Sequence, residues 1–411
     1  MNKNMVKNIL SLFMIQGAGY ILPLITLPYL VRVLGPSEYG ILGFSFAFVQ
    51  YFTLIVQYGF DLSATNKIAI HKDDKTLVSQ VFWGVLFCKT ILVILSALFM
   101  FVIVAFIPSI KEYATVIIVS YTSVIGAAFL PSWLFQGKEK MGWMAISNIA
   151  EKIITLPLIF ICVKSPADTW IVALITGAGF ILGSLFSFYM IYREKWIEWS
   201  LPSYAQIKEQ IHDGRYIFLS NIAGSVYVNS IPVFLGFAAG PVTVGFYVAA
   251  DKIRMAIQGL MGPITQVFYP RISSLMANDK AKGLKMIRTL LYGQNAIVLV
   301  ISLLLMVFAH QIITVFYGDT YLASVSVLVI LAPMVFFISV STVLGVQGML
   351  IIGMKKEFSQ ILWFGAVLNT VAIFPLIWLA GADGAALSVL VTEAVVALLI
   401  VYKTKSIWRR A

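Results

Sequence analysis

The heptapeptide LGPSEYG, Leu34–Gly40, lies between two long apolar segments and is echoed 205 residues later by AGPVTVG, Ala239–Gly245. A Gly-Pro pair is a strong local signal for a turn, so we expect each copy to close a hairpin between two helices. LPLIF at 156–160 is echoed by FPLIW at 374–378. Together these echoes indicate that the second half of the chain repeats the first.

The composition around these turns is that of a membrane protein. The 411 residues are 60% hydrophobic and 11% charged, whereas soluble domains are about 45–50% apolar and about 25% charged. A helix needs about 20 apolar residues to cross a hydrocarbon core of about 30 Å. By that template the sequence predicts twelve transmembrane helices, near 8–31, 38–60, 78–107, 113–135, 142–163, 169–192, 215–239, 242–270, 287–316, 321–352, 357–379 and 383–402.

We therefore expect an all-α polytopic membrane protein with two six-helix lobes. Each half has an even number of spans and enters the membrane from the same side, as parallel repeats do. The predicted divisions are an N-terminal lobe at 1–192, an amphipathic linker at 193–213 and a C-terminal lobe at 214–411. In the linker, Ser203 and Gln206 form a capping box, which predicts a short helix that ends at Asp213-Gly214.

The net charge of +11 is explained by topology rather than by nucleic-acid binding. Most Lys and Arg fall at the N-terminus, in even-numbered loops and in the C-terminal tail, while the odd-numbered loops hold Arg32, Lys111 and Lys164. This positive-inside pattern predicts that both termini and the linker are cytoplasmic. The sequence has no GxxxxGK[ST] phosphate loop, so no nucleotide is expected, and its two cysteines predict no metal site. No cofactor is expected.

Several ionisable residues fall near the middle of predicted spans. A charged side chain at the bilayer centre costs roughly 2.5–3.5 kcal/mol on insertion scales, so such residues normally face a bundle interior or a wet cavity. About ten residues into their spans lie Lys89, Glu151, Lys152, Asp251, Arg254 and Glu393. Two interpretations stay open: a wet, charged cavity shared by four helices, or a set of structural ion pairs.

One span shows helical spacing of its polar residues. Asp251, Arg254 and Gln258 recur at intervals of three and four, so they share one helix face. Lys252 lies about 100° away from Asp251 around the helix. We expect this face to line the cavity.

Three segments make the chain resemble a known family. They are LPYLVRVLGPSEYGILGFSFAFVQYFTLIVQYGF at 27–60, WLFQGKEKM at Trp133–Met141, and VGFYVAADKIRMAI with VFYPRISSLM between Val244 and Met276. They resemble the Wzx-type O-antigen repeat-unit flippases of the multidrug/oligosaccharidyl-lipid/polysaccharide exporter superfamily. The likeness runs from about residue 8 to residue 402.

The resemblance implies two lobes around a central cavity and transport by alternating access. It also implies a cargo, an oligosaccharide on undecaprenyl pyrophosphate, moved from the cytoplasmic to the periplasmic leaflet of the bacterial inner membrane. Membrane lipids and the polysaccharide polymerase or ligase machinery are the other expected partners. An anionic headgroup needs cationic, hydrogen-bonding walls.

Two groups of residues are expected to form the site. The predicted cargo-binding residues are Arg32, Lys89, Lys152, Lys252, Arg254, Gln258 and Arg271. The acidic partners, or proton carriers for coupled transport, are Asp61, Glu151, Asp251 and Glu393.

Two other functions stay open at this point. A drug or cation exporter of the same superfamily would need an acidic cavity, which the surplus of mid-membrane cations disfavours. An integral-membrane glycosyltransferase or polymerase would usually carry a long outer loop, and every predicted outer loop is short. We therefore expect a transporter and not an enzyme.

Overall fold

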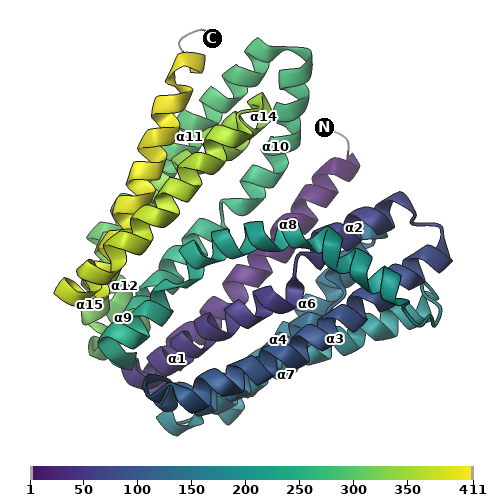
Figure 1. Ribbon diagram of the computed structural model, residues 1–411. Coiled ribbons are helices and arrows are strands. Elements are labelled where there is room, and N and C mark those ends of the chain that lie inside the picture. The colour runs from purple at the N-terminus through teal and green to yellow at the C-terminus, as the bar shows by residue number, and fades with distance from the viewer. Residues whose placement is uncertain (1–2, 409–411) are drawn as a thin grey trace. The chain divides into compact units, whose positions relative to one another are not determined.

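The computed structural model describes residues 3–408, with the side chains of all but 3–23, Ala145, Tyr216, 220–229, Pro263, Gln266 and 406–408. These described residues form helices and no strand (Figure 1). Nine of the described helical segments are long and apolar enough to cross a membrane. The all-α membrane fold is thereby confirmed, while the count of twelve spans stays a prediction.

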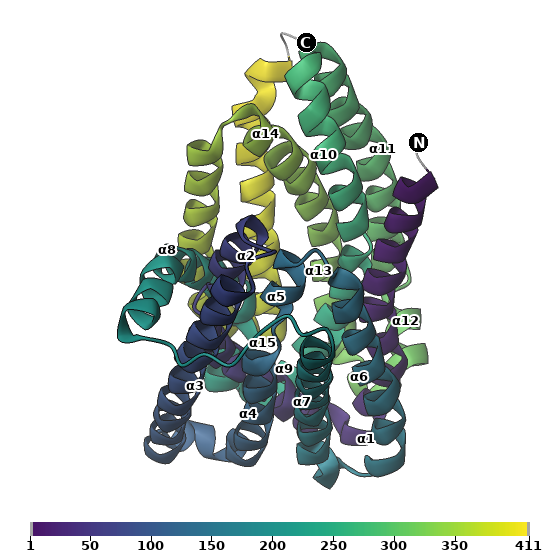
Figure 2. The ribbon, with the colours of Figure 1, turned by 90° about the vertical axis from the view of Figure 1, so that its right-hand side faces the viewer.

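The helices follow one another along the chain (Figures 1 and 2), and the longest connection between described helices runs from Glu194 to Ser203. The first half contains α1 (Lys3–Gln57), α2 (Phe60–Ile70), α3 (Lys75–Phe106), α4 (Ala114–Phe129), α5 (Ser132–Gly137), α6 (Met141–Cys162), α7 (Thr169–Arg193) and α8 (Tyr204–Asn229). The second half contains α9 (Ile231–Gly259), α10 (Gly262–Asn278), α11 (Lys280–Val307), α12 (Ala309–Tyr317), α13 (Ala323–Ser341), α14 (Leu350–Ile352) and α15 (Lys355–Trp408). Short 3-10 helices at Pro108–Tyr113, Pro166–Asp168 and Asp319–Tyr321 and a π-helix at Thr342–Met349 complete the described chain.

Three of the long helices are broken where the sequence predicts a turn. Within α1 the backbone of Gly35 has φ 72° and ψ 173°, and within α9 that of Gly240 has φ 77° and ψ 176°. These two glycines lie at the same position of the repeated heptapeptide and adopt the same positive-φ conformation, which a residue without a β-carbon reaches without strain. In α15 the break falls at Ala380 and Gly381, between two predicted spans.

The contacts divide the chain into two compact units. One unit is formed by the residues up to Gly40 and from Phe234 onward, and the other by Ile41–Val233. The first helical segment therefore packs with residues of the second half. The predicted lobes, at 1–192 and 214–411 with a linker at 193–213, stay a prediction.

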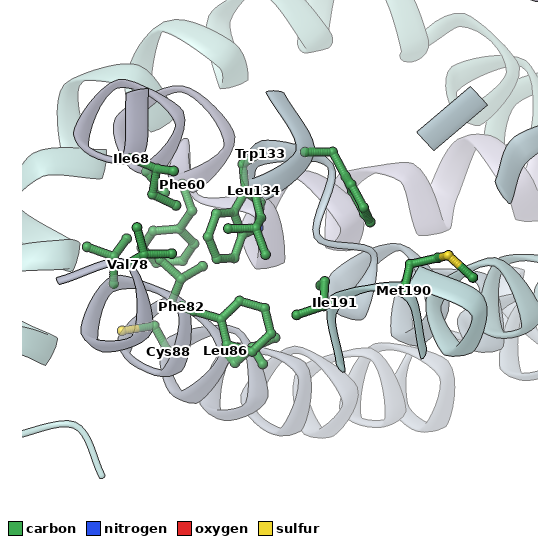
Figure 3. Packing of buried hydrophobic residues seen from close by; sticks show 14 residues of the cluster. Phe60, Ile68, Val78, Phe82, Leu86, Cys88, Trp133, Leu134, Met190 and Ile191 are labelled. Carbon is green, nitrogen blue, oxygen red and sulfur yellow. The ribbon is translucent and has the colours of Figure 1, made fainter. Parts of the chain in front are cut away.

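The unit formed by Ile41–Val233 has a hydrophobic core between α2, α3, α5 and the end of α7. Phe60, Phe82 and Trp133 are fully buried there, and Figure 3 shows Phe82 beside Leu86 and Ile191. Phe82 and Trp133 pack with their ring centroids 5.7 Å apart. Burial of such side chains is the main stabilising contribution of this core.

The structure corrects the prediction for the helix in the linker. The capping box is present, because the Ser203 hydroxyl accepts from the Gln206 amide and the Gln206 side chain accepts from the Ser203 amide. The helix does not end at Asp213-Gly214, however, but continues as α8 to Asn229. Gly214 instead allows close packing, since a β-carbon there would lie 2.6 Å from the Tyr58 carbonyl oxygen.

Candidate functional site

The predicted polar face of α9 forms a hydrogen-bonded chain. Arg254 Nε donates to Asp251 Oδ1 at 2.6 Å, and Arg254 Nη1 donates to Gln258 Oε1. Residues three and four apart lie one above the other on a helix, so the sequence spacing alone brings these groups together. The Arg254 side chain is buried, with 7% of the residue exposed.

Other polar side chains of the same unit lie near the hydrogen-bonded Asp251–Arg254–Gln258 face. Glu393 of α15 is buried and interacts electrostatically with Arg254. Tyr247 lies near both Asp251 and Arg254, and Tyr39 lies near Asp251. The structure thus places Glu393 near the Asp251–Arg254–Gln258 face.

The two buried tyrosines were missed by the sequence analysis. Tyr247 lies four residues before Asp251, so the helical spacing that identified Arg254 and Gln258 would also have found it. Tyr39 belongs to the LGPSEYG turn, and no spacing rule connects it with α9. A phenol carries a hydrogen-bonding hydroxyl on an apolar ring.

Three other predicted cations of this unit lie elsewhere. Lys252 and Arg271 are exposed. Arg32 is used at the end of another helix: its Nε donates to the carbonyl oxygen of Phe316 at 3.0 Å, and its Nη2 to that of Val315. These are terminal carbonyls of α12, which favour a cation.

The second unit contains two further clusters. Lys89 of α3 is fully buried, and its Nζ donates to Gln57 Oε1 at 2.5 Å and lies 3.4 Å from Asp61 Oδ1. In α6, Lys152 Nζ lies 2.9 Å from Glu151 Oε1. Glu151 packs against α7, since its Oε1 would lie 3.1 Å from a β-carbon on Gly179. Each cluster pairs one carboxylate with one ammonium group.

The arrangement neutralises most of the buried charge. Arg254, Lys89 and Lys152 each have a carboxylate partner within 4 Å, so all three cations are ion-paired. An anionic ligand that competes with such a carboxylate would meet a cation already held in place. The described residues contain no group of three or more His, Cys, Asp or Glu able to hold a metal.

Comparison with known sequences identifies related proteins along the whole chain. The family model described as "Polysaccharide biosynthesis protein" matches residues 5–276. A protein of Escherichia coli (strain K12) named "Putative O-antigen transporter" is 38% identical over 394 residues, covering 96% of this chain and 95% of its own length. A protein of Shigella dysenteriae with the same name is 32% identical over 407 residues, covering 98% of this chain and 100% of its own.

Solved structures share the fold at low sequence identity. An inward-facing multidrug resistance MATE family transporter of the MOP superfamily has a TM-score of 0.77 at 15% identity, with 94% of each chain covered. The lipid II flippase MurJ in an inward closed conformation has a TM-score of 0.72 at 13% identity, with 96% of this chain and 87% of that chain covered. The described helices therefore have the arrangement found in these transporters.

Proposed function

The chain belongs to the polysaccharide biosynthesis protein family, and from this membership we propose that it moves a lipid-linked oligosaccharide across a membrane. Its relatives are named as transporters, in agreement with the expectation of a transporter rather than a glycosyltransferase or polymerase. The finer proposal is that the cargo is an oligosaccharide on undecaprenyl pyrophosphate. Its headgroup would pass from the cytoplasmic to the periplasmic leaflet of the bacterial inner membrane by alternating access.

The observation that carries the proposal is the buried guanidinium of Arg254. It is held between Asp251 Oδ1 and Gln258 Oε1, and the buried Glu393 carboxyl group lies nearby. A guanidinium matches the oxygens of a phosphate in a planar, bidentate manner. We propose that the pyrophosphate competes with Asp251 for Arg254, while Gln258 and Tyr247 contact the polar part of the cargo.

The ion pair also explains how the empty protein tolerates a cation in the membrane. Removing one partner of a buried pair leaves an uncompensated charge, which is strongly destabilising. Without cargo, the Asp251 carboxylate would pair with Arg254. When an anionic cargo takes its place, the cargo would pair with Arg254 instead. The guanidinium would therefore have an anionic partner in both states. Lys89 with Asp61 and Lys152 with Glu151 are comparable pairs within the Ile41–Val233 unit.

The predicted topology sets the proposed direction of transport. The Lys and Arg asymmetry between loops favours cytoplasmic termini, and an oligosaccharide assembled in the cytoplasm would therefore enter from the side of the termini. Polymerase and ligase machinery would act on it after transport. No nucleotide-binding motif occurs in the sequence, so the driving force would be an ion gradient or removal of the product.

Reconstitution in liposomes tests this function. Purified protein would be assayed for translocation of an undecaprenyl-pyrophosphate-linked oligosaccharide, comparing wild type with Arg254→Ala. The matched control is Lys356→Ala, which removes an exposed cation near the start of α15. We expect Arg254→Ala to lose most of the translocation and the control to retain it, with equal helicity and equal amounts of protein in the liposomes.

Two results would contradict the proposal. Translocation at the wild-type rate by Arg254→Ala would exclude the α9 face as the cargo site. Absence of lipid-linked sugar translocation by wild-type protein, together with gradient-driven efflux of a cationic drug, would favour the exporter alternative.

A further inference from the structure

One exposed face of α11 changes from basic to aromatic to apolar along the helix. At about 100° per residue, Lys282, Lys285, Arg288 and Tyr292 fall within a stripe about 120° wide, and all four are exposed. The stripe continues through Leu299, Leu303 and Val307, which are also exposed. The helix runs beside α10 (Figure 1). By helical spacing the stripe lies on the side of α11 opposite its buried residues, which include Leu284, Ile287 and Val298.

The basic residues of α11 differ in their partners from three basic residues around the end of α2 and the start of α3 in the Ile41–Val233 unit. In that unit, Lys67 pairs with Glu209 and Asp213, Lys72 with Glu139, and Lys75 with Glu198. These three cations, which lie around the end of α2 and the start of α3, are thus neutralised by acidic residues of the same unit.

Around the start of α11 the cations greatly outnumber the acids. Asp279 is the nearby carboxylate, and it pairs with Lys282. Among the described residues, Lys285 and Arg288 have no carboxylate within 4 Å. The positive charge of this face is therefore available to an external anion.

The spacing along the stripe fits a lipid molecule. Arg288 lies 5.9 Å from the centroid of the Tyr292 ring, which holds the guanidinium beside an aromatic side chain of the kind that prefers the headgroup level of a bilayer. From Tyr292 to Leu303 the helix rises about 16 Å, close to the half-thickness of a hydrocarbon core of about 30 Å. Beside Tyr292 there is open space, because a β-carbon on Gly293 would meet no atom within 4 Å.

We propose that this face of α11, formed by Lys282, Lys285, Arg288, Tyr292, Leu299 and Leu303, is a binding site for an anionic phospholipid. The phosphate of the lipid lies against Lys285 and Arg288, its glycerol backbone lies beside Tyr292 and Gly293, and an acyl chain follows Leu299 and Leu303. Charge complementarity selects an anionic headgroup over a zwitterionic one, since clustered basic residues beside a transmembrane helix attract anionic lipid. This site is separate from the Asp251–Arg254–Gln258 face and does not depend on the cargo.

Direct lipid binding tests the site. Wild-type protein in detergent micelles would be titrated with phosphatidylglycerol, or with phosphatidylcholine as the neutral comparison, and bound lipid counted by native mass spectrometry. The test variant is Lys285→Gln with Arg288→Gln, which keeps side-chain length and removes charge. The matched control is Lys355→Gln with Lys356→Gln, which removes two exposed cations beside Glu357.

The expected result is selective loss of phosphatidylglycerol binding in the test variant. Each juxtamembrane cation is expected to contribute about fivefold in affinity, so the double variant should bind about 25-fold more weakly. The control should bind as wild type does, and phosphatidylcholine should bind equally and weakly to all three proteins. Unchanged phosphatidylglycerol binding in the test variant, or an equal loss in the control, would overturn the proposal.

A competition experiment distinguishes phospholipid from other phosphate-headed lipids. Undecaprenyl phosphate would be added to wild-type protein loaded with phosphatidylglycerol. Retention of phosphatidylglycerol at equimolar competitor supports a phospholipid site. Complete displacement at that ratio would instead assign the face to a prenyl-phosphate lipid and refute the phospholipid proposal, whether or not the protein translocates sugar.

Discussion

Gly40 packs so closely against Pro241 that a β-carbon on Gly40 would lie 1.8 Å from the Pro241 carbonyl oxygen. The reciprocal contact exists at the equivalent residues of the repeat, because a β-carbon on Gly245 would lie 2.0 Å from the carbonyl oxygen of Pro36. The two heptapeptides thus contact each other through matching positions. This contact joins the first helical segment to the second half of the chain.

We predict that Gly40→Ala and Gly245→Ala each destabilise the protein by about 1–3 kcal/mol, the usual cost of overpacking. The added methyl group would meet a backbone carbonyl, which cannot move aside as a side chain can. Thermal unfolding of purified protein measures the loss. Gly142→Ala is the control, because nothing lies within 4 Å of a β-carbon at that position. Equal stability of all three variants would show that the close contact between the two turns does not contribute to the stability of the folded protein.

We predict that Lys89→Met lowers stability by about 1–3 kcal/mol. Methionine retains much of the side-chain volume, but Gln57 Oε1 loses its donor and Asp61 loses its cation. Because Asp61 is partly exposed, water compensates for part of the loss. Unfolding measurements on Lys89→Met, Asp61→Asn and the double variant form a thermodynamic cycle.

The cycle also separates the two interpretations of Lys89. If the double variant recovers stability but fails to translocate lipid-linked sugar, while Asp61→Asn alone still translocates it, the ammonium group acts on the cargo. Full translocation by a stable double variant would leave Lys89 with a structural role alone.

We predict that Asp251→Asn makes translocation insensitive to an imposed proton gradient if Asp251 carries the coupling proton. Asparagine keeps the shape of the side chain and an oxygen that accepts from Arg254 Nε, but it does not exchange a proton. The measurement is lipid-linked sugar translocation in liposomes with and without a pH difference. Equal dependence of wild type and variant on the gradient would restrict Asp251 to neutralising Arg254.

We predict that Asp279 makes stability depend on pH in the acid range. The backbone amide of Lys282 donates to its carboxylate, which lowers the pKa of Asp279 below its ordinary value, with the Lys282 side chain adding to the effect. Because the folded-state pKa is depressed, the contribution is present above the ordinary Asp pKa of about 3.9 and is lost as pH falls through the folded value. Unfolding temperatures between about pH 2 and pH 5 should fall less steeply for Asp279→Asn than for wild type. Parallel curves would refute this role.

The sequence by itself determined the features that depend on neighbouring residues. Hydropathy predicted apolar helices because a segment of about 20 apolar residues is stable in hydrocarbon whatever its partners. The Gly-Pro pairs predicted the breaks at Gly35 and Gly240, and three-and-four spacing placed Asp251, Arg254 and Gln258 together. The capping box at Ser203 and Gln206 was likewise confirmed, since its four residues fix its geometry.

Tertiary structure alone decided which distant groups became partners. Gly214 was expected to end a helix, but it lies inside α8, because packing against the Tyr58 backbone favours a residue without a β-carbon there. The same holds for Arg32 at the end of α12, for Lys89 beside Asp61, and for Tyr39 near Asp251. A local sequence pattern predicts which residues share one face of a helix. The partner of a buried charge depends on how helices far apart in the chain pack together. Spacing along the sequence does not encode this packing.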